Sequence, residues 1–311
     1  MNLNIENKDT FLRKPFVVAG LAFFCCFLWG SALVSIKLGY DLLGISNYDI
    51  YTKLLFAGMR FMLASFLVLT ACILSGFGFK NLKVTRSQLK KLLFIGFLQT
   101  FLQYAFLYIG LANTSGTNGA ILTSTAAFFT VLLAHFFCKG DQLTKRKFLG
   151  VSVGFLGIVI LNLRGVGSFS ILGEGFVILS SLCAASASIY IKSIVKGIPV
   201  FTVAIYQHFT GGLILASVGF IGNGGEFLDF NLQGSLILLQ LAIVSAFAFS
   251  LWSTLLKYND VSKVSIYKFS VPLFGVFLSF ILLQERYVNT VLLLAVALVS
   301  AGIVLINAEK S

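Results

Sequence analysis

The stretch LLFIGFLQTFLQYAFLYIGLANTSGTNGAILTSTAAFFTVLLAHFFC, from Leu92 to Cys138, contains no Lys, Arg, Asp or Glu. It is too long for one membrane crossing, because a helix needs about 20 apolar residues to span the hydrocarbon core of a bilayer. The polar cluster NTSGTN at residues 113–118 divides the stretch and has the composition of a turn. These residues therefore predict two membrane helices joined by a tight turn.

The rest of the chain has the same apolar character. Of its 311 residues, 58% are apolar, 11% are charged and 33 are Phe. A soluble globular domain carries about a quarter charged residues, and the mean hydropathy here is +0.96. The composition excludes an ordinary soluble domain. It predicts an all-α membrane protein, because lipid does not satisfy the hydrogen bonds of an open backbone.

Ten apolar runs predict ten membrane helices. They cover residues 16–36, 54–75, the two halves of 92–138, 148–163, 175–191, 200–221, 232–256, 264–283 and 287–307. The first run follows a basic segment as a signal peptide does, but it continues past any cleavage site, so we interpret it as a retained span. With the N-terminus inside, seventeen Lys and Arg fall in inner segments and four in outer segments. This bias predicts that both termini are cytoplasmic.

The net charge of +12 does not indicate a nucleic-acid partner. The basic residues lie in short clusters between apolar runs, as expected for loop charge that orients a membrane protein. The five cysteines show no spacing typical of a zinc site or a disulfide framework. No GxxxxGK[ST], HExxH or GxSxG motif is present. The sequence therefore offers no chemistry for ATP hydrolysis or for an intramembrane hydrolase, and no cofactor is expected.

The two halves of the sequence correspond when one is shifted by 145 residues. The run GIVI at 157–160 falls on GIVL at 302–305. Each half holds five predicted spans, and an odd number of crossings places the second copy upside down in the membrane. We predict a first unit over residues 17–163 and a second over 173–307. Inverted repeats with a site at their interface are an architecture of secondary transporters.

Three groups of residues occur in the order of a known membrane-protein family. They are Trp29-Gly30-Ser31 with Lys37, Arg60-Phe61 with Ala64, and Pro272-Leu273-Phe274 followed by Glu285-Arg286. Together they resemble the motifs of EamA-type transporters of the drug/metabolite transporter superfamily, and the resemblance covers nearly the whole chain. Two residues depart from the family pattern: Ala127 stands where Pro is usual, and Asp141 where Glu is usual. The first departure removes the usual cause of a kink from the fourth helix.

The resemblance implies a ten-helix carrier in the cytoplasmic membrane of a bacterium. It implies export of small polar metabolites such as amino acids by alternating access, with the first, third, fourth, sixth, eighth and ninth spans lining the cavity. The expected partners are a small-molecule substrate and the lipid bilayer. A monomer suffices, and a homodimer is an alternative. Two other functions stay open, namely a non-transporting sensor or assembly protein and a membrane-embedded enzyme acting on a lipid-like substrate.

Arg60 and Lys268 are the two basic residues within predicted spans. A charge in a membrane helix is costly and normally faces a cavity or a partner. Arg60 either holds a substrate carboxylate or snorkels to the outer interface. Lys268 stands one turn before Pro272, which frees the carbonyl of residue 268 and is our candidate hinge; the alternative is that Lys268 snorkels to the inner surface. No Asp or Glu lies within a predicted span, which disfavours proton-coupled antiport of cationic drugs.

The remaining candidates for substrate binding are aromatic or hydroxyl side chains within predicted spans. They are Trp29, Ser31, Tyr104, Ser186, Tyr190 and Trp252. A buried indole N–H or phenol O–H needs a partner, so such walls suit a small amphipathic solute, and the alternative for each is helix packing. We interpret His208, beside Gln207 in the seventh span, as a hydrogen-bonded packing residue rather than a proton shuttle. The spacings Gly150-x-x-x-Gly154 and Ala297-x-x-x-Ala301 predict close packing of the fifth and tenth spans.

Overall fold

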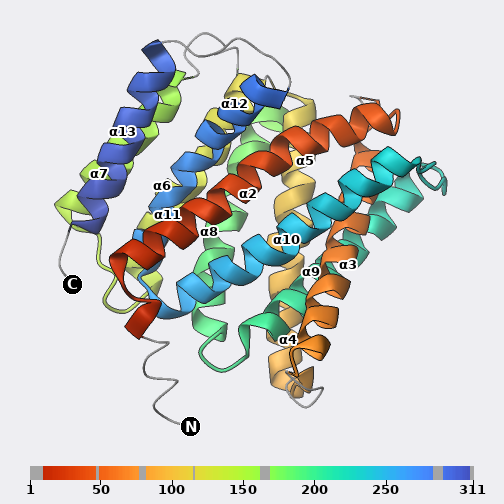
Figure 1. The fold of residues 1–311 in the computed structure, drawn as a ribbon, viewed down its shortest axis with the longest axis horizontal. Coiled ribbons are helices and arrows are strands. Elements are labelled where there is room, and N and C mark those ends of the chain that lie inside the picture. The colour runs from red at the N-terminus through yellow and green to blue at the C-terminus, as the bar shows by residue number, and fades with distance from the viewer. Residues whose placement is uncertain are drawn as a thin grey trace.

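Every regular element in the described part of the computed structural model is a helix (Figure 1). The structure describes residues 10–46, 49–76, 82–114, 116–161, 169–282 and 290–308. The α-helices are α2 (Pro15–Leu42), α3 (Ile50–Leu74), α4 (Arg86–Ile95), α5 (Gln103–Ala112), α6 (Gly116–Phe137), α7 (Lys145–Leu161), α8 (Phe176–Ile194), α9 (Val200–Gly222), α10 (Leu232–Tyr258), α11 (Val261–Ser265), α12 (Ser270–Leu282) and α13 (Thr290–Asn307). Two π-helices, η2 (Gly96–Leu102) and η4 (Ile171–Gly175), and one 3-10 helix, η5 (Ile266–Phe269), continue α-helices. The pair Glu285-Arg286 lies outside the described residues.

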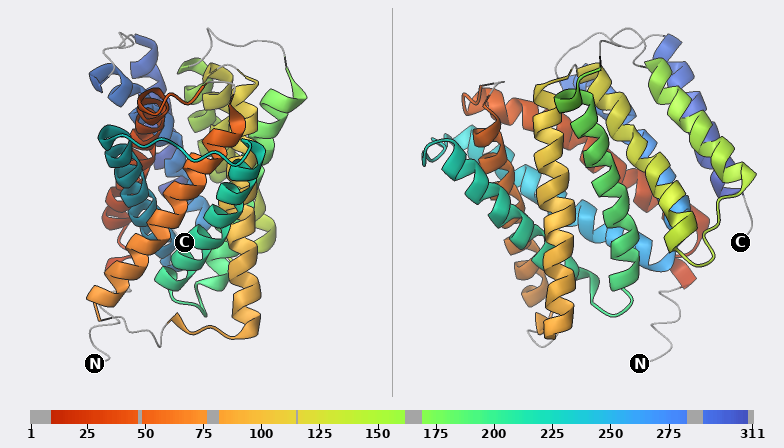
Figure 2. Two further views of the ribbon diagram at one scale, coloured as in Figure 1. Left: turned by 90° about the vertical axis from the view of Figure 1, so that its right-hand side faces the viewer. Right: turned by 180° about the vertical axis from the view of Figure 1, so that it is seen from behind.

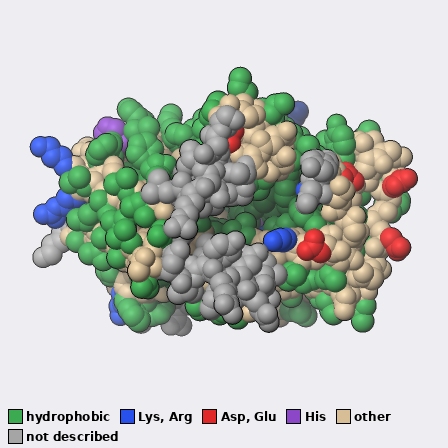
Figure 3. Space-filling view, turned by 90° about the horizontal axis from the view of Figure 1, so that it is seen from above, with side chains coloured by type: hydrophobic (Ala, Val, Ile, Leu, Met, Phe, Trp, Pro, Cys, Tyr) green, Lys and Arg blue, Asp and Glu red, His purple; other side chains and the backbone are tan. Residues whose placement is uncertain are grey.

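The helices follow the predicted apolar runs along the chain. Six helical stretches of the described chain are long and apolar enough to cross a membrane: Pro15–Leu42, Ile50–Leu74, Arg86–Ala112, Ile171–Ile194, Val200–Gly222 and Leu232–Tyr258. The segments Leu122–Phe137 and Leu293–Asn307 are shorter apolar helices. The predicted division of the uncharged stretch is confirmed, because one helix ends at Ala112 and the next begins at Gly116. Figure 3, which looks onto one end of the helices from above, shows hydrophobic side chains with scattered charged side chains among the described residues.

Polar residues cap three of these helices. The Asp49 carboxylate accepts a hydrogen bond from the backbone N–H of Thr52 at the beginning of α3, at 2.9 Å. Thr85 and Gln88 form a reciprocal capping box at the beginning of α4. Asn231 accepts from the N–H of Gly234 at the beginning of α10. Each cap satisfies backbone donors that a helix leaves free, and so fixes where the chain leaves the apolar layer.

The connecting segments gather at two opposite ends of the helices. At one end, Gln88 donates to the carbonyl of Gly197, and Asn259 donates to the carbonyl of Leu12. At the other end, Asn231 donates to the carbonyl of Leu42, and Thr114 donates to Glu174. The first group contains only segments predicted on the inner side, and the second only segments predicted on the outer side. The up-and-down order predicted for these helices therefore agrees with the structure.

Helices of the first half pack against helices of the second half, and the main contacts have equivalents between the corresponding helices of the two halves. The second span of each half packs against its counterpart, as α3 against α9, and so does the fifth, as α7 against α13. The first span of each half packs against the third and fourth spans of the other half: α2 contacts α10 and α12, and α8 contacts α5 and α6. Figures 1 and 2 show α7 and α13 side by side at one edge of the molecule. This pattern is consistent with two repeated five-helix units.

Glycines bring α3 and α9 into backbone contact. A Cβ atom on Gly219 would lie 2.3 Å from the backbone nitrogen of Leu55, and one on Gly58 would lie 2.3 Å from that of Ala216. Gly212 meets Met62 in the same way. Position numbers rise along α9 as they fall along α3, so the two helices are antiparallel. The second spans of the two halves therefore run in opposite directions, as an odd number of spans in each half predicts.

The fifth and tenth helices pack closely, but only one of the two predicted motifs makes the contact. A Cβ atom on Gly302 of α13 would lie 2.5 Å from the carbonyl oxygen of Gly150 and 2.9 Å from the nitrogen of Gly154. The prediction for the glycine pair is thus confirmed. The prediction for Ala297 and Ala301 is wrong, because both residues are exposed on the opposite face of α13. Because Gly302 allows α13 to approach α7 more closely, α13 packs against α7 through the face that carries Gly302.

The ninth helical segment is interrupted, whereas α6 is not. The chain passes from α11 through η5 to α12, and the 3-10 turn ends at Phe269, three residues before Pro272. Proline removes a helix hydrogen bond and its ring crowds the preceding turn, which accounts for an irregular turn at this place. The carbonyl of Tyr267, in this turn, accepts a hydrogen bond from the Cys26 thiol at 3.1 Å. The five cysteines are all free thiols.

Candidate functional site

Arg60 of α3 lies in the interior of the helix bundle. Its side chain is 2% exposed, and its Nε donates a hydrogen bond to the Ser245 hydroxyl of α10 at 2.8 Å. Ser245 in turn donates to the carbonyl of Leu241 at 2.9 Å. No described carboxylate forms an ion pair with Arg60. Arg60 therefore does not snorkel to the interface, and its charge is held at depth by a hydroxyl group.

Aromatic rings surround this arginine. The Arg60 guanidinium lies 5.1 Å from the centre of the Phe61 ring. Phe61 also packs against Tyr104 at 4.7 Å, and stacks on His208 at 5.5 Å between ring centres. Phe249 closes the group, because its ring lies 5.0 Å from that of His208 and 6.2 Å from that of Phe61. Helices α3, α5, α9 and α10 thus contribute one continuous group of rings.

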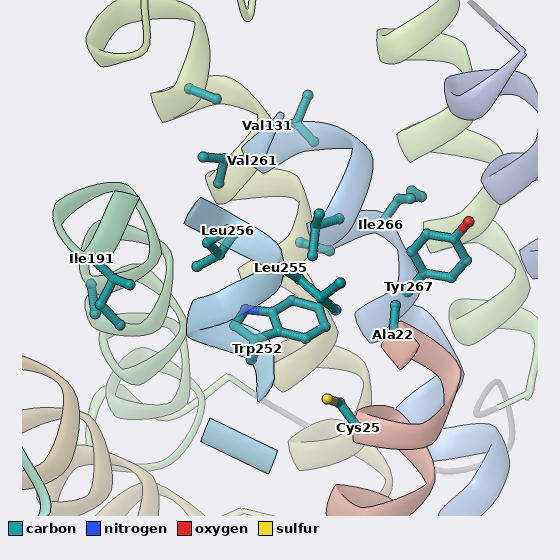
Figure 4. Packing of buried hydrophobic residues seen from close by; sticks show 14 of the residues in the cluster. Ala22, Cys25, Val131, Ile191, Trp252, Leu255, Leu256, Val261, Ile266 and Tyr267 are labelled. Carbon is teal, nitrogen blue, oxygen red and sulfur yellow. The ribbon is translucent and has the colours of Figure 1, made fainter. Parts of the chain in front are cut away.

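The same group continues toward the other end of the bundle through two tryptophans. The Trp29 ring of α2 lies 5.5 Å from that of Phe249 and 5.0 Å from that of Trp252. The Lys268 ammonium lies 5.2 Å from the centre of the Trp252 ring and donates to the Ser188 hydroxyl of α8 at 3.2 Å. Figure 4 shows Trp252 at the centre of the buried core, between residues of α8, α11 and α2. A second, half-buried cation therefore ends this line of rings.

We call this set of residues the central row. Its members are Tyr104, Phe61, His208, Arg60, Ser245, Phe249, Trp29, Trp252, Lys268 and Ser188. Ser245, Phe249 and Trp252 are four and three residues apart, so they share one face of α10. Ser245 and Trp252 are two turns apart, about 10 Å along the helix axis. Helix α10 is thus the wall along which the two cationic positions are spaced.

Several polar atoms of the central row have no hydrogen-bond partner in the described structure. They are Nε1 of Trp29, Nε1 of Trp252 and both ring nitrogens of His208. Trp252 is 2% exposed and His208 is fully buried. A buried polar group without a partner is costly and rare in proteins. His208 packs against rings as expected, but the hydrogen bonds that we predicted for it are absent from the described contacts.

The structure brings five of the predicted substrate-binding residues together and leaves the others apart. Trp29, Arg60, Tyr104, Trp252 and Lys268 belong to the central row. Ser31 instead donates to the Leu28 carbonyl of its own helix at 2.8 Å. Tyr190 packs on Phe94 of α4, with ring centres 5.0 Å apart, and Ser186 is half-buried outside the row. Pro272 lies in the first turn of α12, directly after the interruption that follows Lys268.

Sequence reasoning missed the residues that connect the cations. Ser245 and Phe249 lie in an apolar helix without any distinguishing motif. One signal was available for Ser245, since it falls on Thr100 under the shift of 145 residues. Thr100 contacts the α9 backbone at Gly211. The third spans of the two halves thus both place a hydroxyl residue against the α3–α9 pair.

A separate polar cluster lies at the end of the bundle predicted to face inward. Asp141, after α6, is 3% exposed and pairs with Lys147 at 2.7 Å. Its other oxygen accepts the backbone N–H of Ser262 in the first turn of α11 at 2.9 Å, and the Ser262 hydroxyl also donates to Asp141. Burial, together with the negative charge of Asp141, raises the pKa of the nearby Cys138 thiol. The cluster ties the α6–α7 connection to the beginning of the interrupted segment.

Comparison with known proteins gives relatives over almost the full chain. A model of the EamA-like transporter family matches residues 17–163 and 171–308. A protein of Archaeoglobus fulgidus named as an uncharacterized transporter is 27% identical over 83% of this chain and 86% of its own length. The uncharacterized transporter YetK of Bacillus subtilis is 26% identical over 79% of this chain and 76% of its own. One crystal structure superposes with a TM-score of 0.77 at 16% identity, covering 94% of this chain and 97% of the other. That structure supports the fold alone.

Proposed function

Because the chain belongs to the EamA-like transporter family, we propose that it is a secondary transporter that moves a small polar metabolite across the membrane by alternating access. The family resemblance is confirmed by this match and by relatives that are named as transporters. Outward movement and amino acids or their analogues follow the habit of the family. The cytoplasmic membrane of a bacterium is the location that we propose for it.

The observation that carries the proposal is a buried arginine whose described partner is a hydroxyl group instead of a carboxylate. Arg60 donates to Ser245 and lies next to rings whose polar atoms have no described partner. An uncompensated charge inside a membrane protein is expensive, and it marks a substrate or ion pathway more often than a packing role. A solute carboxylate would supply the missing negative charge. Trp29, Arg60, Tyr104, Trp252 and Lys268 are the residues that we propose for the site.

The arrangement of the helices supports alternating access. We propose ten membrane crossings, with both termini on the cytoplasmic side as the excess of basic residues on that side predicts. The central row lies between α2, α3, α5, α8, α9, α10 and the interrupted segment, which belong to both halves of the chain. Its members are packed against one another in this conformation, so a solute reaches them only when the halves move. The interruption before Pro272 is the place at which we propose a hinge.

Counterflow in proteoliposomes tests this function. The purified full-length protein is loaded with pools of amino acids, organic acids, nucleosides, sugars or cationic drugs, and uptake of the labelled pool is measured. Saturable exchange with one pool supports a carrier. Absence of exchange with every pool, by protein that is folded in the same vesicles, contradicts the proposal and favours a sensor or an enzyme.

Replacement of Arg60 sharpens the test. Arg60→Gln keeps a hydrogen-bond donor but removes the charge, so we expect exchange of a carboxylate solute to fall roughly 10- to 100-fold, the usual value of a charged hydrogen bond. Arg60→Lys should retain part of the activity. The control is Lys90→Gln, which removes an exposed charge of α4. Unchanged exchange by Arg60→Gln would remove this residue from the site.

A further inference from the structure

The acidic residues of the chain are excluded from the region of the central row. No Asp or Glu occurs at positions 50–140, 175–225 or 230–259. These ranges contain α3, α5, α8, α9 and α10. The two ion pairs that the described structure shows, Lys147–Asp141 and Lys263–Asp260, lie at the ends of helices. The wall of the proposed site therefore carries positive charge and no negative charge.

The two cationic positions are similar in construction. Arg60 contacts a hydroxyl on Ser245 and the ring of Phe61. Lys268 contacts a hydroxyl on Ser188 and the ring of Trp252. Both are held by a neutral hydroxyl and an aromatic face, and neither forms an ion pair with a described carboxylate. Each position thus keeps a positive charge available for an anion.

The hydrogen-bonding groups of the row have the same bias. The unpartnered indole nitrogens of Trp29 and Trp252 are donors only. Guanidinium and ammonium groups are also donors only. A ligand that satisfies these indole and cationic groups must supply acceptors and negative charge, whereas a neutral His208 imidazole has one donor and one acceptor nitrogen. None of these groups needs a positive group in the ligand.

On these grounds we propose that the substrate is an organic anion whose remainder is uncharged, and that its carboxylate binds at two successive subsites, one at Arg60 and one at Lys268. This inference rests on the proposed transport function and narrows its substrate class. The two subsites are two turns of α10 apart, about 10 Å. A short acid occupies one of them at a time and passes the tryptophan pair between them.

A free amino acid fits this site less well than a derivative without its ammonium group. In a zwitterion the ammonium lies within a few ångströms of the carboxylate, so binding at Arg60 or Lys268 places like charges near each other. No described carboxylate pairs with Arg60 or Lys268, and Asp41 of α2 lies exposed near the end of its helix. The ammonium would therefore lack a partner there, and an unpaired charge in a desolvated site is strongly disfavoured. An N-acylated amino acid or a hydroxy acid avoids this cost and offers additional acceptors to the indole N–H groups.

Intrinsic fluorescence offers a direct binding test, because the two tryptophans of the chain are Trp29 and Trp252, both in the central row. The purified full-length protein is titrated with N-acetylated alanine, leucine and phenylalanine, with the three free amino acids, and with their amides. We expect a saturable change in emission for at least one N-acetyl anion at a concentration at least tenfold lower than for its matched zwitterion, and none for the cationic amide. If no anion binds more tightly than its matched zwitterion, the inference is overturned.

The Lys268 subsite is tested by Lys268→Gln and Lys268→Arg. We expect Lys268→Gln to weaken binding of the anion about tenfold, because it removes one charge-assisted contact, and Lys268→Arg to restore most of it. Lys263→Gln is the matched control, since this lysine lies on the same segment in a partly exposed pair with Asp260. Equal affinity in Lys268→Gln and the control would overturn the second subsite, provided that both variants retain the wild-type melting temperature.

Transport measurements separate this inference from the proposed function. Counterflow of free amino acids, without exchange of any N-acetyl anion, would leave the carrier in place and overturn the anion inference. Tight binding of an anion by fluorescence, without counterflow of any solute, would support the anion site and contradict the carrier. Counterflow of the anion that binds would support both.

Discussion

The fourth helical segments of the two halves, α6 and α11–η5–α12, differ in their regularity. Helix α6 runs without interruption from Gly116 to Phe137, whereas its counterpart changes to a 3-10 turn over Ile266–Phe269. Ala127 occupies the position that Pro272 holds in the second half. The irregular turn carries Lys268 into the central row. Alanine thus lies in the continuous segment and proline beside the interrupted, charged one, as expected from the hydrogen bond that proline removes from a helix.

In the third segments the irregular helix lies in the first half and the regular helix in the second. In the first half α4 and α5 are separated by the π-helix η2, while α10 of the second half is continuous. A Cβ atom on Gly96, the first residue of η2, would lie 1.8 Å from the hydroxyl of Thr210, so the backbones there approach closely. π-Helical segments are often found at functional sites. Each half thus contributes one regular and one irregular wall, and the symmetry of helix pairing does not extend to the details of the site.

The largest effect is expected where the broken segment is anchored. Asp141→Ala would leave Lys147 buried without its carboxylate and the N–H of Ser262 without an acceptor. Loss of one partner of a buried ion pair costs about 3–5 kcal/mol, so we expect a marked fall in melting temperature in detergent. Asp141→Glu is the control, because it keeps the charge. A wild-type melting temperature for Asp141→Ala would show that α11 does not depend on this anchor.

A reciprocal exchange between the two fourth segments tests the role of the proline itself. Ala127→Pro introduces the ring into the continuous α6, where it should cost about 3 kcal/mol or more by removing a helix hydrogen bond. Pro272→Ala should change stability much less, because the structure is already adapted there, but it should slow transport if the interruption is a hinge. Thermal melting and initial counterflow rates measure both. Equal destabilisation by the two changes would mean that the difference between the segments has another cause.

The smallest effect is expected at the contact between α7 and α13, the fifth spans of the two halves. Gly150→Ala and Gly302→Ala each place a methyl group within 3 Å of a backbone oxygen of the other helix. Overpacking of this kind costs about 1–3 kcal/mol, and the two changes should cost similar amounts because the helices exchange roles. Gly20→Ala is the control, with nothing within 4 Å of the added carbon. Unequal costs in melting experiments would show that the symmetry of α7 and α13 is only apparent.

The sequence predicted the helices better than it predicted the site. Helix positions follow from runs of apolar residues, and the end of one helix at Ala112 follows from a local polar cluster. Arg60 and Lys268 were recognised as candidates because a charge in an apolar run is conspicuous at once. The partner of Arg60 was not recognised, because Ser245 is 185 positions away and resembles many other serines. Ser31 illustrates the reverse error, since a hydroxyl near a motif bonds its own helix.

What the sequence by itself determined is the helical, lipid-facing character of the chain, the correspondence of its two halves and the absence of acidic residues from most of its apolar runs. These properties depend on each residue and its near neighbours, because solvation by lipid acts on a segment as a whole. The tertiary structure decided which face of each helix turns inward. It selected Gly302 over Ala297 as the contact of α13 with α7, and it aligned Ser245, Phe249 and Trp252 with two distant cations. Such choices depend on the fit between surfaces far apart in the chain, and no local pattern encodes that fit.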